Sequence, residues 1–235
     1  MRTVSRTFLR EVDRDLARDV GLVCAAIVVV GVSFGAVAVS AGLPVWLPVA
    51  LSLLVFAGAS QFVFVGLLLA GGGVVAAVAA ALLVNARHLP FGLVVGDLLG
   101  SGRMRRLVGS HLMIDESVAF ALAQDGVARR RDAFWASGVA LFASWNLAVI
   151  IGAAAGTAVS DTGALGLDAA FPAVLLALIV PSLRDRATRR AAVVGVLVAL
   201  AAAPFAPVGL PVLLALAGVA AGRDRAFVLA GRAQS

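Results

Sequence analysis

Asn85, Arg87 and His88 form a compact polar cluster inside an otherwise apolar part of the sequence. The eleven residues before it, Val74 to Val84, carry no charge. As a helix they would extend about 16 Å at roughly 1.5 Å per residue, about half of a hydrocarbon core of roughly 30 Å. If Gly73 lies at one membrane face, the cluster lies near the midplane. Because ionisable residues at this depth in a membrane are costly, we predict that an arginine and a histidine here mark a functional site.

Pro90 interrupts any continuous helix through this cluster. Proline has no N–H to donate to the carbonyl of Ala86, its ring clashes with that turn, and Leu89 is pushed out of the helical region. We therefore predict a broken membrane helix whose chain turns at Asn85 to Pro90 and returns to the face it came from. Irregular backbone at that depth is tolerated where it lines a protein cavity. A half-helix beginning near Pro90 would offer free amides to a carboxylate.

Other polar residues lie within predicted apolar spans and join the candidate site. Gln61 and Ser60 belong to a Gly-Ala-Ser-Gln interruption, and a glutamine in lipid must face protein or water. We weigh interhelical hydrogen bonding and substrate contact evenly for Gln61. Ser33 lies between Gly31 and Gly35, a small-xxx-small pair whose simpler interpretation is the close approach of another helix. The predicted substrate-binding residues are Asn85, Arg87, His88, Gln61, Ser60, Ser33 and Asn146.

Titratable groups around the cluster are candidates for proton coupling. We interpret Asp115 and Glu116 as a solvated pair that matches nearby arginines or, alternatively, as a proton or ammonium acceptor at the mouth of the cavity. Arg87 has a structural alternative, in which it pairs with Asp97 or with carbonyl groups, and His88 has one as a packing histidine. The proton-coupling candidates are His88, Asp97, Asp115 and Glu116.

Composition indicates an all-α integral membrane protein. Hydrophobic residues make up 62% of the 235 residues, and the mean hydropathy is +1.05, values typical of multi-span proteins. The net charge is +6, but the arginines are confined to clusters between apolar runs, which fits positive-inside topology better than nucleic-acid binding. Cys24 is the single cysteine, so no internal disulfide forms. His88 and His111 have no ligand at zinc spacing, and no catalytic constellation, P-loop or cofactor motif is present, so we expect no metal, no cofactor and no enzyme activity.

The chain divides into four parts in sequence order. Residues 1–20 carry arginine and apolar stripes at four-residue spacing, which predicts an amphipathic helix at the cytoplasmic interface. Residues 21–100 and 133–223 each contain two spans followed by a broken apolar pair, which suggests an internal two-fold repeat as found in transporters. Residues 101–132 form a cytoplasmic segment between the halves. The predicted full spans are 21–41, 45–69, 134–156 and 169–183.

The arginine clusters constrain the topology. If all of them are cytoplasmic, the number of crossings between Val20 and Arg103 must be even. The spans 21–41 and 45–69 already satisfy this condition, so residues 73–99 would enter and leave on one side. Residues 191–222 consist of two apolar runs too short for a full bilayer, which favours re-entry there as well. Two short tilted spans are the alternative.

Several stretches together resemble the AzlC-type branched-chain amino acid permease family, the large subunit of a bacterial exporter. The similar stretches are Phe34-Gly-Ala-Val-Ala with Ala41-Gly-Leu, Phe56-Ala-Gly-Ala-Ser-Gln-Phe62, Leu83-Val-Asn-Ala-Arg-His-Leu89 with Gly92, Asp115-Glu116, and Gly166-Leu-Asp-Ala-Ala-Phe-Pro-Ala173 continuing to Pro181. Asn-x-Arg-His is the most specific of them. This chain has Pro90 where the family often has an aromatic residue, which bears on the shape of the pocket.

The resemblance implies a multi-span helical transporter with discontinuous or re-entrant helices. It would export valine, leucine or isoleucine across the bacterial plasma membrane, usually with a small AzlD-type membrane subunit. We expect cytoplasmic termini, lipid contact around the spans and association with further copies of the chain. The alternatives are a non-transporting membrane scaffold subunit and a transporter of another small neutral solute.

Overall fold

Helices form the regular secondary structure of the described part of the chain. The computed structural model describes residues 14–158, 176, 180–206 and 210–222, and these contain no strand. Three segments are long and apolar enough to cross a membrane: Arg14–Ser40, Val74–Leu99 and Val127–Gly156. The predicted all-α membrane class is thereby confirmed. The predicted span 169–183 lies largely outside the described residues.

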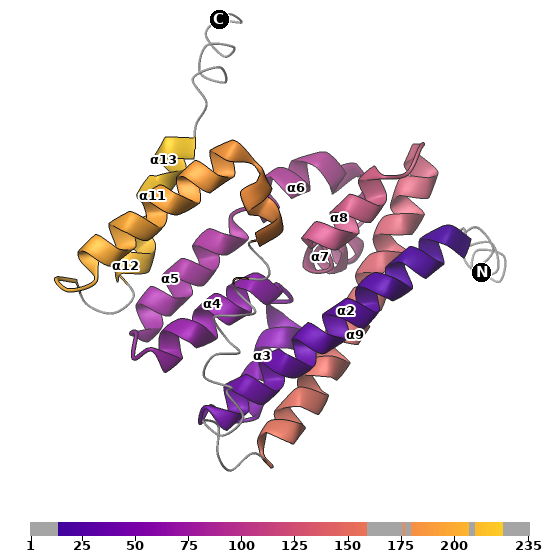
Figure 1. Cartoon of the computed structure of the whole chain (residues 1–235). Helices are drawn as coiled ribbons and strands as arrows, with labels where there is room; N and C mark the ends of the chain where they lie inside the picture. Colours follow the sequence, from indigo (N-terminus) through magenta and orange to yellow (C-terminus); the bar gives the residue numbers. More distant parts are fainter. Residues whose placement is uncertain (1–13, 159–175, 177–179, 207–209, 223–235) are drawn as a thin grey trace, which may run out of the picture. The chain divides into compact units, whose positions relative to one another are not determined.

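The chain forms two compact units (Figure 1), which we describe separately. The first comprises residues 1–61 and 85–170, and the second residues 62–84 and 171–235. The predicted halves, 21–100 and 133–223, divide the chain differently, and the internal repeat stays a prediction.

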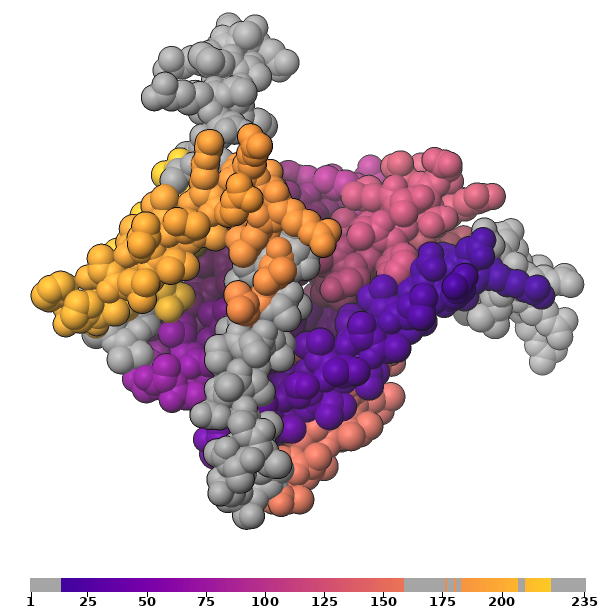
Figure 2. All heavy atoms as spheres, viewed as in Figure 1, coloured from indigo at the N-terminus to yellow at the C-terminus, as the bar shows by residue number. Residues whose placement is uncertain are grey.

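Two long helices, α2 (Arg14–Ser40) and α9 (Val127–Gly156), form the framework of the first unit. They lie side by side over much of their length (Figure 2). A side chain at Gly35 would overlap the backbone of Val149 and Ala153, and one at Gly152 would overlap the backbone of Val32. The helices therefore meet backbone to backbone, as the small-xxx-small pattern of α2 predicts. Helix α2 continues through the boundary predicted at residue 20, so residues 14–20 are its first turns and not a separate element.

Helices α2 and α9 run in the same direction. Gly31 lies opposite Trp145 and Ala148, and Gly156 lies opposite Ala36, so residue numbers rise together along the contact. The arginines at the start of α2 consequently lie at the same end of the pair as residues 129–131, all arginine, at the start of α9. This agrees with the common side that the charge pattern predicts for both clusters.

Helices α3 (Trp46–Leu54) and α4 (Gly58–Leu69) make up the interrupted second span predicted over 45–69. The interruption covers residues 55–57, just before the Gly-Ala-Ser-Gln stretch where the sequence predicts it. Phe56 has a φ of 41°, the left-handed region that bulky residues rarely adopt. The chain therefore changes direction here through a conformation that the surrounding contacts must hold.

Helices α5 (Val74–Asn85) and α6 (His88–Val95) confirm the second predicted interruption, and a 3₁₀ helix, η1 (Gly96–Leu99), follows α6. The break consists of Ala86 and Arg87, earlier than Pro90. Pro90 is the third residue of α6, within the first turn, where its missing N–H removes no intrahelical hydrogen bond. The turn thus ends before the proline and not at it.

The parallel course of α2 and α9 limits how the chain between them crosses a membrane. If both helices cross, an odd number of crossings must lie between Ser40 and Val127. The apolar segments in this interval are the α3–α4 pair and Val74–Leu99. An odd number of crossings requires that one of them crosses the membrane and that the other returns to the face from which it entered. A re-entrant course of residues 73–99 satisfies this condition, as does the reverse assignment, and that course stays a prediction.

Helices α7 (Arg103–His111) and α8 (Asp115–Leu122) make up most of the segment predicted to be cytoplasmic. Helix α8 packs against α9, and Val118 and Ala121 join Phe134 in a buried cluster with Val95 and Leu99. The hydroxyl of Ser117 donates to the carbonyl of Leu112, which fixes the connection between α7 and α8. The segment is therefore packed into the first unit and does not form a loose loop.

In the second unit, the end of α4 and α5 share a buried cluster of Leu67, Ala77 and Ala80, against which Leu213 packs. Helix η2 (Val180–Arg184) precedes α11 (Arg186–Ala202), which packs against α12 (Leu210–Leu214), η3 (Ala215–Ala217) and α13 (Gly218–Gly222). Gly195 lies against Ala215 and Gly218 against Ala191, so the chain turns back after α11 and runs antiparallel to it. The predicted broken pair over 191–222 is present; its course relative to a membrane stays a prediction.

Candidate functional site

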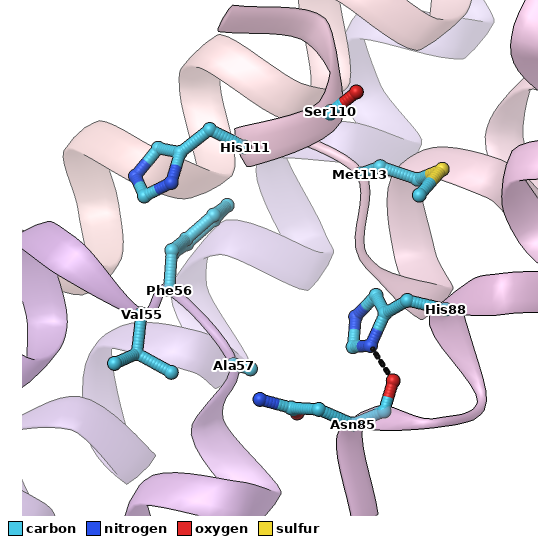
Figure 3. Close-up of a pocket in the computed structure, with 8 residues that line it drawn as sticks. All are labelled: Val55, Phe56, Ala57, Asn85, His88, Ser110, His111 and Met113. Carbon is cyan, nitrogen blue, oxygen red and sulfur yellow. Dashed lines mark hydrogen bonds between the residues drawn. The ribbon is translucent and has the colours of Figure 1, made fainter. Parts of the chain in front are cut away.

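Both helix interruptions of the first unit end at one cavity. Its volume is about 190 Å³, smaller than the roughly 300 to 1,000 Å³ of pockets for drug-sized ligands. Figure 3 shows Asn85 and His88 pointing into the space from one side, and Phe56 and His111 closing the other. The lining residues are Val55, Phe56, Ala57, Asn85, His88, Ser110, His111 and Met113.

His88 is held in one orientation by its own turn. Its Nδ1 lies 2.9 Å from the backbone oxygen of Asn85, and its ring meets that of Phe91 edge-on at 5.8 Å. Because a carbonyl oxygen only accepts, Nδ1 carries the proton and Nε2 is the acceptor of the neutral ring. The ring can therefore accept an N–H or a proton at Nε2, and it becomes a donor there once protonated.

Asn85 presents a second acceptor. Its side-chain oxygen Oδ1 is buried and has no hydrogen-bond partner in the part of the chain that the structure describes. A buried polar atom without a partner is uncommon in folded proteins, because its desolvation is then uncompensated by roughly 1 to 3 kcal/mol. Nε2 of His88 therefore offers an acceptor to a ligand that brings N–H donors, and Oδ1 of Asn85 would offer a second one if the amide, whose nitrogen leads into the space in Figure 3, turned over.

Two rings, those of Phe56 and His111, close the opposite side of the cavity, and the ring of Phe142 packs against both. Phe56 meets Phe142 edge-on at 5.0 Å, and His111 meets Phe142 at 5.5 Å, with Phe56 and His111 themselves 6.2 Å apart. Only 4% of the surface of Phe56 is exposed. These contacts stabilise the left-handed backbone at Phe56, and they give the cavity an apolar wall.

Arg87 pairs with Asp115. Its Nη2 lies 2.9 Å from Oδ2 of Asp115, and the two side chains are 38% and 42% exposed. The alternative prediction, that Arg87 pairs with Asp97, is wrong. Asp97 is exposed in η1 and forms no ion pair among the described residues. The ion pair joins the α5–α6 turn to the start of α8, and neither residue lines the cavity. Beside it, burial raises the pKa of Glu116, and the charge of Asp115 raises it further.

Gln61 belongs to a buried network that fastens the α3–α4 interruption to α9. Its Nε2 donates to the carbonyl of Leu51 over 3.1 Å, and its Oε1 accepts from Nε1 of Trp145 over 3.2 Å. Nearby, the Ser52 hydroxyl donates to Oδ1 of Asn146 over 2.8 Å. Each of the two amides, Gln61 and Asn146, thus has hydrogen-bond partners within the protein, which matches the interhelical interpretation of Gln61.

The two predicted serines also bond within their own helices or turns. The hydroxyl of Ser60 donates to the carbonyl of Ala57, and that of Ser33 donates to the carbonyl of Val29. Like Gln61 and Asn146, they are absent from the lining of this cavity. Of the seven predicted substrate-binding residues, the structure therefore brings Asn85 and His88 to the cavity and leaves Arg87 at its edge, in the ion pair.

Sequence reasoning missed the aromatic wall and the α7–α8 connection. From the sequence, His111 is predicted only to be unable to share a metal with His88. In the structure the rings of both residues line one cavity. No cluster of three or more metal-ligating side chains occurs in the described part of the chain. No periodicity marks Phe56, His111 or Met113; the strained turn at Phe56 and the packing of α7 bring them together.

Comparison with known proteins identifies a family. The family model described as AzlC protein matches residues 22–159, more than half of the chain. No curated protein and no solved structure matched.

Proposed function

Because this chain belongs to the AzlC family, we propose that it exports valine, leucine or isoleucine across a membrane as a secondary transporter. The family is a transporter family associated with branched-chain amino acid transport. The matched residues include both helix interruptions and all eight residues that line the cavity.

The observation that carries the proposal is that two helix interruptions end at one small, partly polar cavity. Secondary transporters commonly bind their substrates at discontinuous helices, where irregular backbone lines a cavity. The acceptors of Asn85 and His88 suit the ammonium group of an amino acid. His111, which lies on the other side, would supply an N–H donor for its carboxylate.

The walls suit a small branched side chain. Val55, Ala57 and Met113 add apolar surface to the ring of Phe56. A methylene group in such a pocket changes binding by only about 1 to 3 kcal/mol. We therefore expect modest discrimination among valine, leucine and isoleucine, and stronger discrimination against charged amino acids.

The remaining assignments belong to the same proposal. We place the protein in the bacterial plasma membrane with both termini cytoplasmic, because the arginine clusters obey the positive-inside pattern. A small AzlD-type subunit is the expected partner. Proton coupling would use Nε2 of His88, whose proton acceptor faces the cavity.

Counterflow tests this function. Proteoliposomes that contain the chain and its small partner are loaded with unlabelled valine, and uptake of labelled valine is measured. We expect His88→Ala and Asn85→Ala to lower the initial rate at least tenfold, because each removes an acceptor from the cavity. Ser33→Ala is the matched control, since its hydroxyl bonds only to its own helix, and its rate should equal that of the wild type. Absence of counterflow in the wild type would instead support a non-transporting scaffold.

A charge exchange separates two roles for Arg87. We propose that Arg87 acts by holding the α6 turn against α8 through Asp115, so Arg87→Asp alone should be inactive. Combining it with Asp115→Arg should restore at least part of the transport rate. If the double variant reaches the membrane and remains inactive, Arg87 instead binds the substrate carboxylate directly.

A further inference from the structure

A second group of arginines in the first unit lies away from the cavity, where α7 packs against the start of α9. Gly109 of α7 faces the ring of Trp135 at close contact distance, so the helices touch there. The guanidinium carbon of Arg105 lies 5.5 Å from the centroid of the Trp135 ring. Arg105 is therefore fixed over Trp135 by a cation–π contact.

Two hydrogen-bond donors at this place have no acceptor. Nε1 of Trp135 and Nε of Arg131 are both buried, and neither has a hydrogen-bond partner among the described residues. The two residues are four apart in α9, so their side chains lie on the same face, one turn from each other. Arg105 reaches the same face from α7. The cluster therefore gathers donors and positive charge, and among the described residues no carboxylate pairs with either arginine.

We propose that Arg105, Arg131 and Trp135 bind the phosphate group of an anionic membrane lipid. Arginine suits phosphate because its planar fork gives parallel charge-assisted hydrogen bonds. A tryptophan N–H near the end of a membrane span typically meets the polar head-group layer. A phosphate oxygen would satisfy both orphan donors.

The surroundings favour a lipid over a soluble anion. Helix α7 carries Met104 and Leu107, which are 71% and 67% exposed, next to its arginines. Arg103 and Arg105 are exposed as well, and Nε of Arg106 donates a hydrogen bond to the carbonyl of Gly100. Exposed apolar and basic side chains on one short helix are typical of an element that lies in the membrane interface. Trp135 belongs to a candidate membrane span, Val127–Gly156. The ligand should therefore have both a phosphate and acyl chains.

Thermal unfolding of the full-length detergent-solubilised protein tests the proposal. Phosphatidylglycerol and phosphatidylcholine with the same acyl chains are titrated in parallel, because a ligand stabilises the state that it binds. We expect phosphatidylglycerol to raise the unfolding temperature more than phosphatidylcholine does. Arg131→Gln and Trp135→Phe should each weaken the apparent affinity for phosphatidylglycerol about tenfold, the effect of losing one hydrogen bond to a charged group.

Arg129→Gln is the matched control, because it removes the same charge from the same end of α9. Its response to phosphatidylglycerol should stay within twofold of the wild type. Arg131→Lys keeps the charge but loses the Nε donor, so it tests the site even if the glutamine variant fails to fold, and it should also bind more weakly.

Three outcomes would overturn the proposal. Equal weakening by Arg129→Gln and Arg131→Gln would indicate diffuse attraction to a negative surface. Equal stabilisation by inorganic phosphate and phosphatidylglycerol would indicate a soluble anion. Equal responses to the two lipids would show that the site does not select an anionic lipid, since phosphatidylcholine also carries a phosphate.

Discussion

The α2–α9 pair and the cavity region belong to one unit and are built in opposite ways. The pair consists of two unbroken helices that touch through glycines. The cavity region has two helix interruptions, a left-handed phenylalanine, and a buried Oδ1 on Asn85 without a partner. Close packing of small residues leaves no room for a ligand. The interruptions, by contrast, expose polar groups to a space that a ligand can fill.

The contrast indicates a division of labour within the unit. The pair supplies a fixed frame, and the Gln61–Trp145 hydrogen bond ties the first interruption to that frame. The cavity therefore rests on a rigid helix on one side and on the short α6 on the other. Substitutions in the frame should cost stability, whereas substitutions on the cavity wall should cost transport.

The largest effect should come from the frame. Gly35→Val places a branched side chain against the backbone of α9, so we expect a loss of about 3 kcal/mol or more and little folded protein. Gly21→Ala in the same helix is the control, because nothing lies within 4 Å of that position; it should be neutral or stabilising. Yield and thermal unfolding in detergent measure both. Normal folding of Gly35→Val would contradict the backbone contact.

A smaller loss of stability should follow from removing the Gln61 hydrogen bonds that join the α2–α9 frame to the cavity region. Gln61→Met keeps the volume but leaves the indole N–H of Trp145 and the carbonyl of Leu51 without partners. We expect about 2 to 4 kcal/mol of destabilisation. Ser60→Ala, also buried but bonded only to the nearby Ala57, should cost about 1 kcal/mol. Equal losses in the two variants would mean that the network does not join the regions.

The smallest effect should depend on pH and lie at the edge of the cavity. Burial raises the pKa of Glu116 above its ordinary value of 4.5. At pH values between 4.5 and the raised pKa of the folded state, the folded protein binds more protons than the unfolded chain. The contribution of Glu116 to stability therefore falls as the pH rises. Glu116→Gln should therefore unfold at a higher temperature than the wild type at pH 8, and at the same temperature below pH 4.5. A difference independent of pH would contradict the assignment.

Sequence reasoning reached those parts of the molecule that local rules determine. The proline at position 90 implied a break nearby, and Gly31 with Gly35 implied a close helix contact; both are present. Gly152 and Gly156 in α9 have the same four-residue spacing as Gly31 and Gly35 in α2. In the folded protein the two glycine pairs face each other across the α2–α9 contact.

Partners distant in sequence could not be deduced. Arg87 had several carboxylates within reach, and only the placement of α8 selects Asp115 over Asp97. Gln61 and Asn146 looked equally suited to bind a substrate, because a polar residue in an apolar span indicates that it has a partner and not which one. The roles of Phe56 and His111 depend on a backbone conformation that composition does not encode.

The glycine contact between α2 and α9 also has a consequence for biosynthesis. Gly35 leaves the ribosome long before Gly152, by about 6 to 20 seconds at roughly 5 to 20 residues per second. During that interval the narrow face of α2 has no permanent neighbour. Lipid or the insertion machinery must cover this face until α9 is inserted and replaces it. The α2–α9 pair can therefore assemble only late in synthesis.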